Sequence, residues 1–497
     1  MSNDTSIENN QNEAAPAQPE AKPAPAAQAE PNATNVSRRG FLTGAAGLAA
    51  GTLLSPALSP RAFGPFVARA AMPGEQKLNV MFVGTAGRAE SHVGDLLGGR
   101  KQNCVAYADV DTNRQGKAKE LAPNAPAFTD WRAMFDAHLD KADAVIVAIP
   151  DHSHALPSLH AMLAGKPVYC EKPLTWSIEE ARLMANTARL KKVATQMGNQ
   201  GHSGEGIRLV VEWIRAGLIG DVVETHTWTN RPVWPQGNLP IKEIPKPDSL
   251  NWDVWLGPAA ERPYQENLHS FNWRGWFDFG CGAVGDMGCH TWDAVFWSMN
   301  PDYPSSVELL AVEEPGPHTF AKKTHFKWTF PAKGKRPGFV SHWYSGGLKP
   351  PTPDEVKNDT DRPEDKRNLP DTGCLYIGTK GKLLVAGDYS DSPRLIPEKF
   401  MRDAKRPEKT IPRVGDHMGD FLKGARGETA WDAPDSNFSG YAGPLTEVML
   451  LGSLVEKIAE VGYKFECDPV RREIITPRVR AMRSREYRKG FELPKIA

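Results

Sequence analysis

Residues 78–89, Leu-Asn-Val-Met-Phe-Val-Gly-Thr-Ala-Gly-Arg-Ala, join a short apolar run to a turn that contains two glycines. A strand that ends in such a turn and leads into a helix is typical of a dinucleotide-binding unit. The turn departs from the usual G-x-G-x-x-G pattern because alanine holds the second and third glycine places. The second glycine normally lets the backbone approach a pyrophosphate, so Ala86 weakens the signal and Gly87 is expected to supply the room. We expect the cofactor to contact Gly84, Thr85, Ala86, Gly87 and Arg88.

Strand and helix patterns alternate from this turn to residue 197. Further strands are expected at 104–109, 144–149 and 167–170, and helices at 90–97, 153–163 and 177–190. The run 144–149 is apolar throughout, as expected for a parallel strand covered on both faces. Ser177 and Glu180 form a capping box at the start of the last helix. This alternation predicts an α/β fold with a doubly wound parallel Rossmann sheet over 77–197.

Strands predominate after a predicted helix at 207–216. They are expected at 222–229, 307–312, 325–330, 338–345 and 374–386, and several alternate polar with apolar residues. That alternation is typical of a mainly antiparallel sheet with one open face. We therefore expect a second, α+β domain over 198–465 that carries the substrate and the oligomer contacts. It includes a long surface loop at 346–371 and a late helix at 444–460, and it is followed by a tail over 466–497 that forms a solvated strap.

The first 70 residues have the composition of a leader. Residues 1–36 are rich in Ala, Pro, Gln, Glu and Asn and cannot bury a core. Arg38 and Arg39 precede a weakly hydrophobic stretch, and Ala68-Arg69-Ala70 offers a small-x-small cleavage site. This arrangement predicts export through the twin-arginine machinery to the periplasm or beyond, although a chance Arg-Arg pair in a tail is the alternative. No later apolar run is long enough for a membrane span in the mature protein.

The charge balance and the cysteines exclude some classes of function. The chain has 60 Lys and Arg residues against 60 Asp and Glu residues, so it lacks the basic surface that nucleic acid requires. Its six cysteines match no metal-binding motif, and no metal site is expected from them. Cys104 and Cys170 lie in predicted strands and are expected to be buried thiols, whereas pairing of the others in an oxidising compartment stays open.

Asp109 is expected to select the cofactor. It closes the second predicted strand about 25 residues after Gly84, close to the spacing of an acid that binds the adenosine ribose 2′-hydroxyl. An acid at this position repels a 2′-phosphate, so NAD is favoured over NADP. The alternative is a solvated turn residue beside Asp111.

Three further residues have the chemistry of a dehydrogenase. Lys172 follows a buried strand in Glu171-Lys172-Pro173, and ligands of open α/β sheets bind at this end of the strands. Asp286 and His290 are four residues apart, so they share one face if the segment is helical. Hydride leaves a carbinol carbon only as its hydroxyl proton is withdrawn, which suits a histidine base and a nearby ammonium group.

Together these motifs resemble the Gfo/Idh/MocA family, which includes glucose–fructose oxidoreductase and inositol dehydrogenase. The strongest stretches are Pro150-Asp151-His152-Ser153-His154-Ala155, Glu171-Lys172-Pro173 and Gly285-Asp286-Met287-Gly288-Cys289-His290. Three other stretches are similar to an exported branch of the family: Asn272-Trp273-Arg274-Gly275-Trp276, Tyr441-Ala442-Gly443-Pro444-Leu445 and Tyr487-Arg488-Lys489-Gly490-Phe491. The resemblance implies a sugar or polyol dehydrogenase that forms homo-dimers or homo-tetramers.

The resemblance also implies roles for particular residues. Lys172 matches the catalytic lysine, Asp286 the substrate-orienting carboxylate and His290 the proton-transferring residue. Pro150, His154 and Glu171 are expected at the cofactor. Trp273, Trp276 and His202 are candidate sugar contacts, because aromatic faces pack against the apolar side of a pyranose. The alternatives are a solvated turn for Lys172, a helix-start carboxylate for Asp286, and core or structural positions for His290, His154 and the tryptophans.

Several functions share this equipment. The leading hypothesis is an exported NAD-dependent oxidoreductase that acts on a sugar, polyol or glycoside hydroxyl. An NAD-dependent glycoside hydrolase, which works by transient oxidation and elimination, is the alternative, but Lys172 counts against it. An oxidoreductase that pairs one sugar as donor with another as acceptor, and a non-catalytic cofactor-bound sensor, also stay open.

Overall fold

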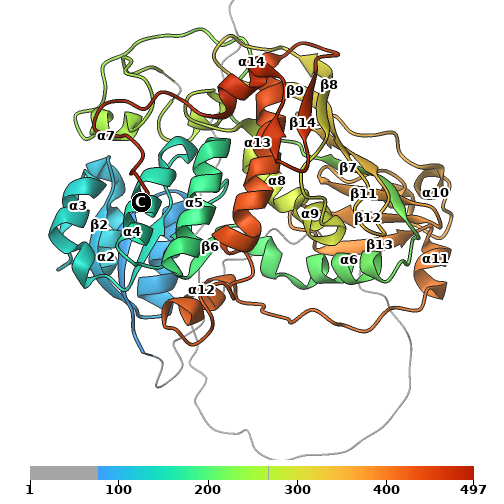
Figure 1. Ribbon diagram of the computed structural model, residues 1–497, viewed down its shortest axis with the longest axis horizontal. Coiled ribbons are helices and arrows are strands. Elements are labelled where there is room, and N and C mark those ends of the chain that lie inside the picture. Colours follow the sequence, from blue (N-terminus) through green and yellow to red (C-terminus); the bar gives the residue numbers. More distant parts are fainter. Residues whose placement is uncertain (1–75, 267, 497) are drawn as a thin grey trace, which may run out of the picture. The chain divides into compact units, whose positions relative to one another are not determined.

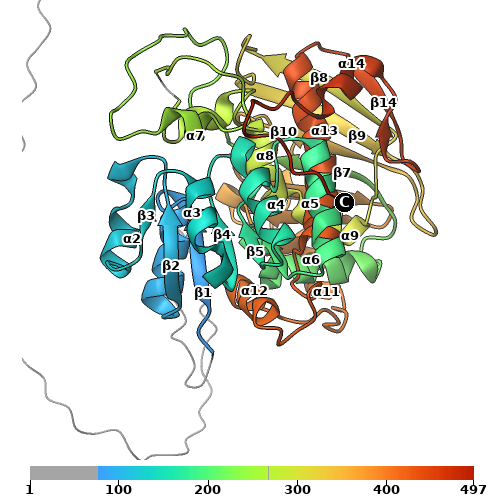
Figure 2. The same ribbon diagram turned by 60° about the vertical axis from the view of Figure 1, so that its left-hand side comes forward.

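The computed structural model describes residues 76–266 and 268–496, and within them a parallel sheet opens the chain. Six strands lie in the order β3-β2-β1-β4-β5-β6, and every neighbouring pair is parallel (Figure 2). This confirms the predicted Rossmann sheet. The strands are β1 (Asn79–Val83), β2 (Asn103–Ala108), β3 (Ala127–Phe128), β4 (Ala144–Val147), β5 (Val168–Cys170) and β6 (Thr195–Met197).

Helices cover both faces of this sheet. Successive side chains of β1 point to opposite faces and are buried on both, so each face needs a cover. Met81 and Val83 belong to the core that includes α3 (Trp131–His138), α4 (Ala155–Leu163) and α5 (Ile178–Lys191). Val80 and Phe82 face the opposite way, toward α1 (Arg88–Val93), which continues as a π-helical stretch over Gly94–Gly99, and α2 (Gly116–Leu121). The predicted capping box of Ser177 and Glu180 opens α5.

A helix from the far end of the chain completes the second of these faces. In α12 (His417–Ala425), Phe421 and Leu422 are buried in the same cluster as Val80 and Phe82. No local sequence pattern predicts this helix, which lies within the range 198–465 expected for the second domain.

The larger sheet has nine strands in the order β13-β12-β11-β7-β10-β9-β8-β14-β15. Only β7 and β10 pair in parallel among its neighbours, so the sheet is mixed and mostly antiparallel, as predicted. The strands are β7 (Val222–Trp228), β8 (Ser306–Glu313), β9 (Lys323–Phe330), β10 (Phe339–Tyr344), β11 (Gly373–Gly378), β12 (Lys382–Ala386), β13 (Ser392–Ile396), β14 (Lys464–Asp468) and β15 (Glu473–Ile474).

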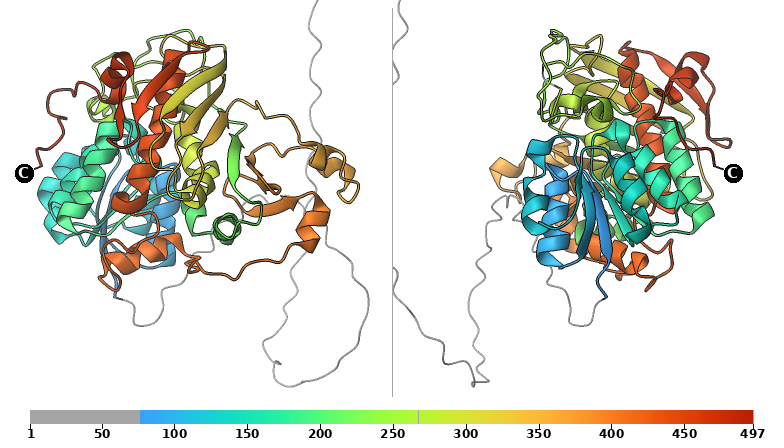
Figure 3. Two further views of the ribbon diagram at one scale, coloured as in Figure 1. Left: turned by 45° about the vertical axis from the view of Figure 1, so that its right-hand side comes forward. Right: turned by 90° about the vertical axis from the view of Figure 1, so that its left-hand side faces the viewer.

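One face of this sheet packs on helices. Phe326 and Trp328 of β9 point toward α13 (Gly443–Ile458), where Trp328 Nε1 donates a hydrogen bond to the carbonyl of Val448 at 3.2 Å. The same helix also packs against α5 and α8 (Gly282–Thr291), and its long ribbon lies between α5 and the larger sheet (Figures 1 and 3). It therefore connects the helices of the Rossmann sheet with the larger sheet. The remaining α-helices are α6 (Glu205–Arg215), α7 (Trp252–Leu256), α9 (Asp293–Met299), α10 (Asp354–Lys357), α11 (Glu398–Asp403) and α14 (Pro477–Arg480).

The structure differs from the prediction at three places. The single strand expected at 374–386 is a hairpin, β11 and β12, that turns at Thr379–Gly381. The loop 346–371 contains α10 and folds over one end of the open sheet face, where Val356 and Leu369 are buried with Trp228. The tail is not simply solvated, because the Arg485 guanidinium lies 3.3 Å from the centre of the Trp176 ring and Tyr487 donates a hydrogen bond to Glu180.

Two other expectations concern the export signal and the cysteines. The predicted export signal lies outside the described residues. Within the described part of the chain no helix is long and apolar enough to cross a membrane. The six cysteines are all unpaired, and Cys170 is buried as expected, whereas Cys104 is partly exposed.

Candidate active site

A cavity of about 650 Å³ lies at the carboxyl ends of the parallel strands. The turns after β1, β2, β4 and β5 form one wall, with Gly84, Asp109, Pro150 and Lys172. Segments from the second half of the chain form the other wall and include Trp234, His269, Trp273, Arg274, Asp286, His290, Asp388 and Tyr389. A dinucleotide and a small substrate both bind at this edge in doubly wound folds, so the position suits both.

The turn after β1 is held so tightly that only glycine fits its first position. Gly84 has a φ of +92°, and a Cβ atom there would lie 2.3 Å from the carbonyl oxygen of Ala148. Its amide donates a hydrogen bond to the Ala108 carbonyl at 2.7 Å, which fixes the turn between β2 and β4. Gly87, with a φ of +63°, then begins α1 without any side-chain cap. Backbone N–H groups at such a helix start are suited to an anion.

Substitution of Gly84 by alanine tests this turn. The added methyl group meets the Ala148 carbonyl and also requires a left-handed backbone, so the turn has to move by a fraction of an ångström. We expect a loss of stability of about 1–3 kcal/mol and a loss of NAD affinity of at least about tenfold. Chemical denaturation and fluorescence titration with NAD measure the two effects.

Gly165→Ala is the matched control. Gly165 also has a positive φ, of +75°, but its Cβ would meet nothing within 4 Å. It therefore carries the backbone strain without the clash, and NAD affinity should be retained. Equal NAD affinity in the two variants would contradict the role given to the Gly84 turn.

Asp109 lies on the cavity wall with its carboxylate held in place. Its Oδ2 accepts hydrogen bonds from the amide of Thr85 at 3.0 Å and from the Thr85 hydroxyl at 3.1 Å, and its Oδ1 accepts one from the Asp111 amide. Thr85 itself is fully buried and does not line the cavity. Its place in the structure is to orient Asp109, whereas Ala86, Gly87 and Arg88 line the wall.

Glu171 and Arg88 form a charged group at the side of the turn. Glu171 accepts hydrogen bonds from Arg88 Nε at 3.1 Å and from His92 Nε2 at 2.7 Å. Burial alone would raise the pKa of the Glu171 carboxyl, but the charge of Arg88 and the contact with His92 bring it well below its ordinary value. The carboxylate lies so close to Gly198 that a Cβ there would be 2.6 Å from it.

Lys172, Asp286 and His290 meet at the same cavity. Residues 282–291 are helical as α8, so Asp286 and His290 share one face as predicted. Lys172 Nζ donates hydrogen bonds to Asp286 Oδ1 at 2.8 Å and to the Asp286 carbonyl at 2.9 Å. The peptide bond between Lys172 and Pro173 is cis.

Lys172 and Asp286 are charged at neutral pH, whereas His290 is neutral. Burial works against the ammonium of Lys172, but Asp286 more than compensates and raises its pKa. Burial likewise works against the Asp286 carboxylate, yet Lys172 and Arg274 lower its pKa. Burial, helped by the charge of Lys172, lowers the pKa of His290 to about 3. Lys172 and Asp286 are therefore an ion pair at neutral pH, and His290 is a neutral imidazole whose Nδ1 has no hydrogen-bond partner among the described residues.

Asp151 and Arg274 are functional candidates that we did not select from the sequence, although both lie inside motifs quoted above. Burial raises the pKa of Asp151 to about 7, against the opposing charges of Arg274 and Lys172. An acid that titrates near neutral pH on the wall of a cavity is a candidate for proton transfer. Arg274 Nε donates to Asp286 Oδ1 at 3.3 Å, so it shares that carboxylate with Lys172. Nothing in the sequence indicated Tyr389, which follows β12 and whose ring lies 4.8 Å from that of His290, centre to centre, in a tilted arrangement.

Three residues expected at the ligand lie elsewhere. Both ring nitrogens of His154 face backbone carbonyls, those of Pro173 at 2.9 Å and Ile149 at 2.7 Å, so it ties two strand ends together. His202 is buried against Asp293, 3.0 Å away, and Gln200 of the same segment lines the cavity instead. Trp276 is 1% exposed in a cluster of aromatic residues, whereas Trp273 lines the cavity.

Two family models match the Rossmann sheet and the first part of the second domain. Residues 78–199 match the oxidoreductase family model with a NAD-binding Rossmann fold, and residues 210–334 match the C-terminal alpha/beta domain of the same Gfo/Idh/MocA family. The chain belongs to the Gfo/Idh/MocA oxidoreductase family. Residues 78–199 are thus a NAD(H)-binding Rossmann domain, in agreement with the cavity at the ends of its strands.

Relatives within the family are distant. An uncharacterized oxidoreductase of Streptococcus pneumoniae is 36% identical over 27% of this chain and 35% of its own length. Inositol 2-dehydrogenase of Rubrobacter xylanophilus is 31% identical over 36% of this chain and 53% of its own length. The chain therefore spans about half, or less, of the length of these two relatives.

Solved structures agree on the fold. The WlbA dehydrogenase of Bordetella pertussis, a complex with NADH and UDP-GlcNAcA, is 16% identical and superposes with a TM-score of 0.54 over 79% of this chain and 99% of that one. An oxidoreductase of Thermotoga maritima gives a TM-score of 0.51 at 14% identity, over 79% of this chain and 98% of that one. Such low identity extends the likeness to the fold and no further.

Proposed function

We propose that this protein oxidises a hydroxyl group of a sugar, polyol or glycoside with NAD as the cofactor. The observation that carries the proposal is the Lys172–Asp286 ion pair beside the neutral His290, on the wall of a cavity that also contains the Gly84 turn and Asp109. NAD, when bound, supplies the acceptor for the two electrons and the hydrogen that leave the substrate carbon.

The residues of the first wall fit a dinucleotide. The uncapped helix start at Gly87 offers backbone N–H groups to a pyrophosphate, and Asp109 offers its carboxylate to ribose hydroxyls. Pro150 and Glu171 lie further along the same wall toward Lys172. This arrangement supports a position of the cofactor's reacting end beside the Lys172–Asp286 pair.

The opposite wall suits a hydroxyl-rich ring. Trp234, Phe271 and Trp273 offer apolar ring surface, while Arg231, Arg274 and Asp388 offer charged hydrogen-bonding groups. Such a mixture of flat aromatic surface and polar groups is what a pyranose or cyclitol requires, because one side of the ring is apolar and its rim carries hydroxyls.

The protonation states of Lys172, Asp286 and His290 support a distinct role for each in proton transfer. Lys172 stays protonated against Asp286, so it donates a hydrogen bond to the substrate oxygen and stabilises negative charge that develops there. His290 is neutral and can accept the hydroxyl proton, directly or through Lys172 as a relay. Asp151 also lines the cavity and has a pKa near 7, so its carboxyl group can hold or release a proton at neutral pH.

Asp109 gives a test of the cofactor preference. Asp109→Ser removes the charge that repels a 2′-phosphate, and Arg114 borders the cavity beside it. We expect the ratio of kcat/KM for NAD over NADP to fall by at least about tenfold. Steady-state kinetics with both cofactors measure the ratio, and the exposed Asp136→Ser on α3 is the control. An unchanged ratio would remove Asp109 from the ribose site.

Two parts of the proposal concern the setting of the enzyme. We propose export through the twin-arginine pathway, on the basis of Arg38, Arg39 and the flanking residues. An enzyme that crosses the membrane folded can take up NAD beforehand and keep it. We also propose a homo-dimer or homo-tetramer, which sedimentation of the purified protein would test.

Product analysis tests the reaction class. The protein is incubated with NAD and a panel of sugars, cyclitols and aryl glycosides, and the products are separated and identified by mass spectrometry. The proposal predicts a product that has lost two hydrogens together with one equivalent of NADH. Release of the aglycone without net NADH would replace it by the glycoside hydrolase cycle. Paired oxidised and reduced sugars would restrict it to closed donor–acceptor turnover.

A further inference from the structure

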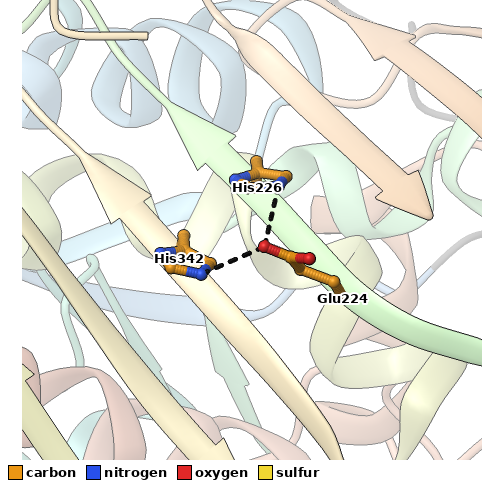
Figure 4. Close-up of side chains that lie close together, drawn as sticks. All are labelled: Glu224, His226 and His342. Carbon is orange, nitrogen blue, oxygen red and sulfur yellow. Dashed lines mark ion pairs between the residues drawn. The ribbon is translucent and has the colours of Figure 1, made fainter. Parts of the chain in front are cut away.

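A cluster of metal-ligand side chains lies on the open face of the large sheet. Glu224 and His226 are two residues apart on β7 and therefore point to the same face of the sheet. His342 of β10 is in register with His226 across the parallel pair. Figure 4 shows the three side chains directed toward one another. Glu224 Oε1 lies 3.2 Å from His226 Nε2 and 3.2 Å from His342 Nε2. None of the three lines the active-site cavity.

The two distances of 3.2 Å between Glu224 and the histidines are typical of ligand atoms that bind one metal ion. Ligand atoms that each lie 2.0–2.2 Å from a tetrahedral Zn²⁺ are separated by about 3.3 Å. The potential ligand atoms of all three residues lie within 4.8 Å of one another. Two imidazoles and one carboxylate form a common donor set for divalent transition metals.

The far side of each imidazole is already engaged. His226 Nδ1 lies 3.1 Å from the Tyr344 hydroxyl, and His342 Nδ1 lies 2.9 Å from His325 Nε2. Partners on the second nitrogen fix the ring orientation and the tautomer of metal-binding histidines. Here they leave both Nε2 atoms turned toward Glu224.

The surroundings allow an ion to enter. The Glu224 side chain is 38% exposed, while His226 and His342 are largely buried. Lys327 of β9 is the nearby positive charge, and Glu308 neutralises it at 3.0 Å. The site is thus open on the carboxylate side and walled by rings on the other.

We propose that Glu224, His226 and His342 bind a divalent transition-metal ion, for which Zn²⁺ is the probe. The ion would join β7 to β10, the only parallel pair among the described strands of this sheet, and would keep open coordination positions for water or a further ligand. Because the site is separate from the cavity, the proposal stands whether or not the proposed oxidoreductase activity is correct.

Metal titration of the full chain tests the proposal. The protein is purified without a histidine tag, stripped with a chelator and titrated with Zn²⁺ by calorimetry and with Co²⁺ by visible absorption. We expect one saturable site per chain, a tetrahedral Co²⁺ spectrum and a higher melting temperature in the presence of Zn²⁺. His226→Gln/His342→Gln should abolish all three signals.

Two further variants keep the test decisive. Glu224→Gln changes a partly exposed side chain and should fold normally, yet it should weaken Zn²⁺ binding at least about tenfold. His325→Phe removes a partner of a ligand and should weaken binding about 10–100-fold. The exposed His318→Gln is the control and should bind as the unmodified protein does.

Two outcomes would overturn the proposal. One is the absence of saturable binding in the stripped protein, which would leave the cluster as a hydrogen-bond network in which both Nε2–H groups donate to Glu224. The other is equal binding by the folded Glu224→Gln variant and the unmodified protein, which would place the ion elsewhere on the chain.

Discussion

Replacement of Lys172 by methionine is expected to lower kcat by about 10²–10³-fold. Lys172 is the cation that faces the reacting hydroxyl in the proposed site, and Asp286 holds it charged at 2.8 Å. Loss of one preorganised donor at a developing oxyanion costs about that factor. Methionine keeps the length and the apolar stem, so NAD affinity should change little. Steady-state kinetics and NAD titration separate the two quantities.

A second variant and a control variant extend this prediction. Asp286→Asn leaves Lys172 without its counter-ion, so the pKa of Lys172 should fall and kcat should acquire a new dependence on pH above neutrality. The exposed Lys119→Met on α2 is the matched control for loss of a lysine. If Lys172→Met retained the kcat of the unmodified protein, Lys172 would have no part in the chemistry.

Replacement of Glu456 by glutamine is expected to remove a large pH dependence of stability. Glu456 of α13 is 2% exposed and accepts a hydrogen bond from the Thr324 hydroxyl of β9. Burial raises the pKa of this carboxyl from 4.5 to about 8, although the Thr324 contact lowers it in part. The folded chain therefore keeps a proton up to about pH 8 that the unfolded chain loses near pH 4.5.

The sign of the effect follows from this difference. Between pH 4.5 and pH 8 the folded state binds the extra proton, so the free energy of unfolding falls as the pH rises and levels off above pH 8. The total is on the order of a few kcal/mol. Glutamine cannot ionise, so Glu456→Gln should gain stability over the unmodified protein as the pH rises toward 9.

Denaturant unfolding at pH 5, 7 and 9 measures this prediction. Glu460→Gln is the control, because Glu460 is an exposed acid just beyond the end of the same helix. Parallel pH profiles for Glu456→Gln and the unmodified protein would show that Glu456 is ionised in the folded state.

Much of the fold could be predicted because its signals are local. Apolar runs such as 144–149, the glycine turn and the capping box of α5 each depend on residues close in the sequence. The sequence pattern predicts one strand at 374–386 because the turn of the β11–β12 hairpin, Thr379–Gly381, interrupts it only briefly. Helix α12 could not be placed, since its partners on the Rossmann sheet lie 220 or more residues earlier in the sequence, counted from Met197 at the end of β6 to His417.

The residues of the candidate site likewise fall into those that local patterns predict and those that depend on tertiary packing. Gly84, Asp109 and Lys172 were accessible to prediction because the ends of parallel strands meet at one edge of a sheet. Asp286 and His290 followed from their spacing on a helix. His154, His202 and Trp276 have side chains that also suit a ligand, and only tertiary packing decides that they are buried against other groups. Tyr389 reaches His290 from a loop that no local pattern connects with the site.

The most direct test of the central claim is the absorbance of the purified protein at about 340 nm, where reduced nicotinamide absorbs, while sugars, cyclitols and glycosides are added. The first series contains no added NAD, and the second contains an excess. If this site oxidises such hydroxyls, at least one compound produces the band in the unmodified protein, and Lys172→Met produces it far more slowly. No band with any compound, even with excess NAD, would contradict the oxidation of such hydroxyls by this site.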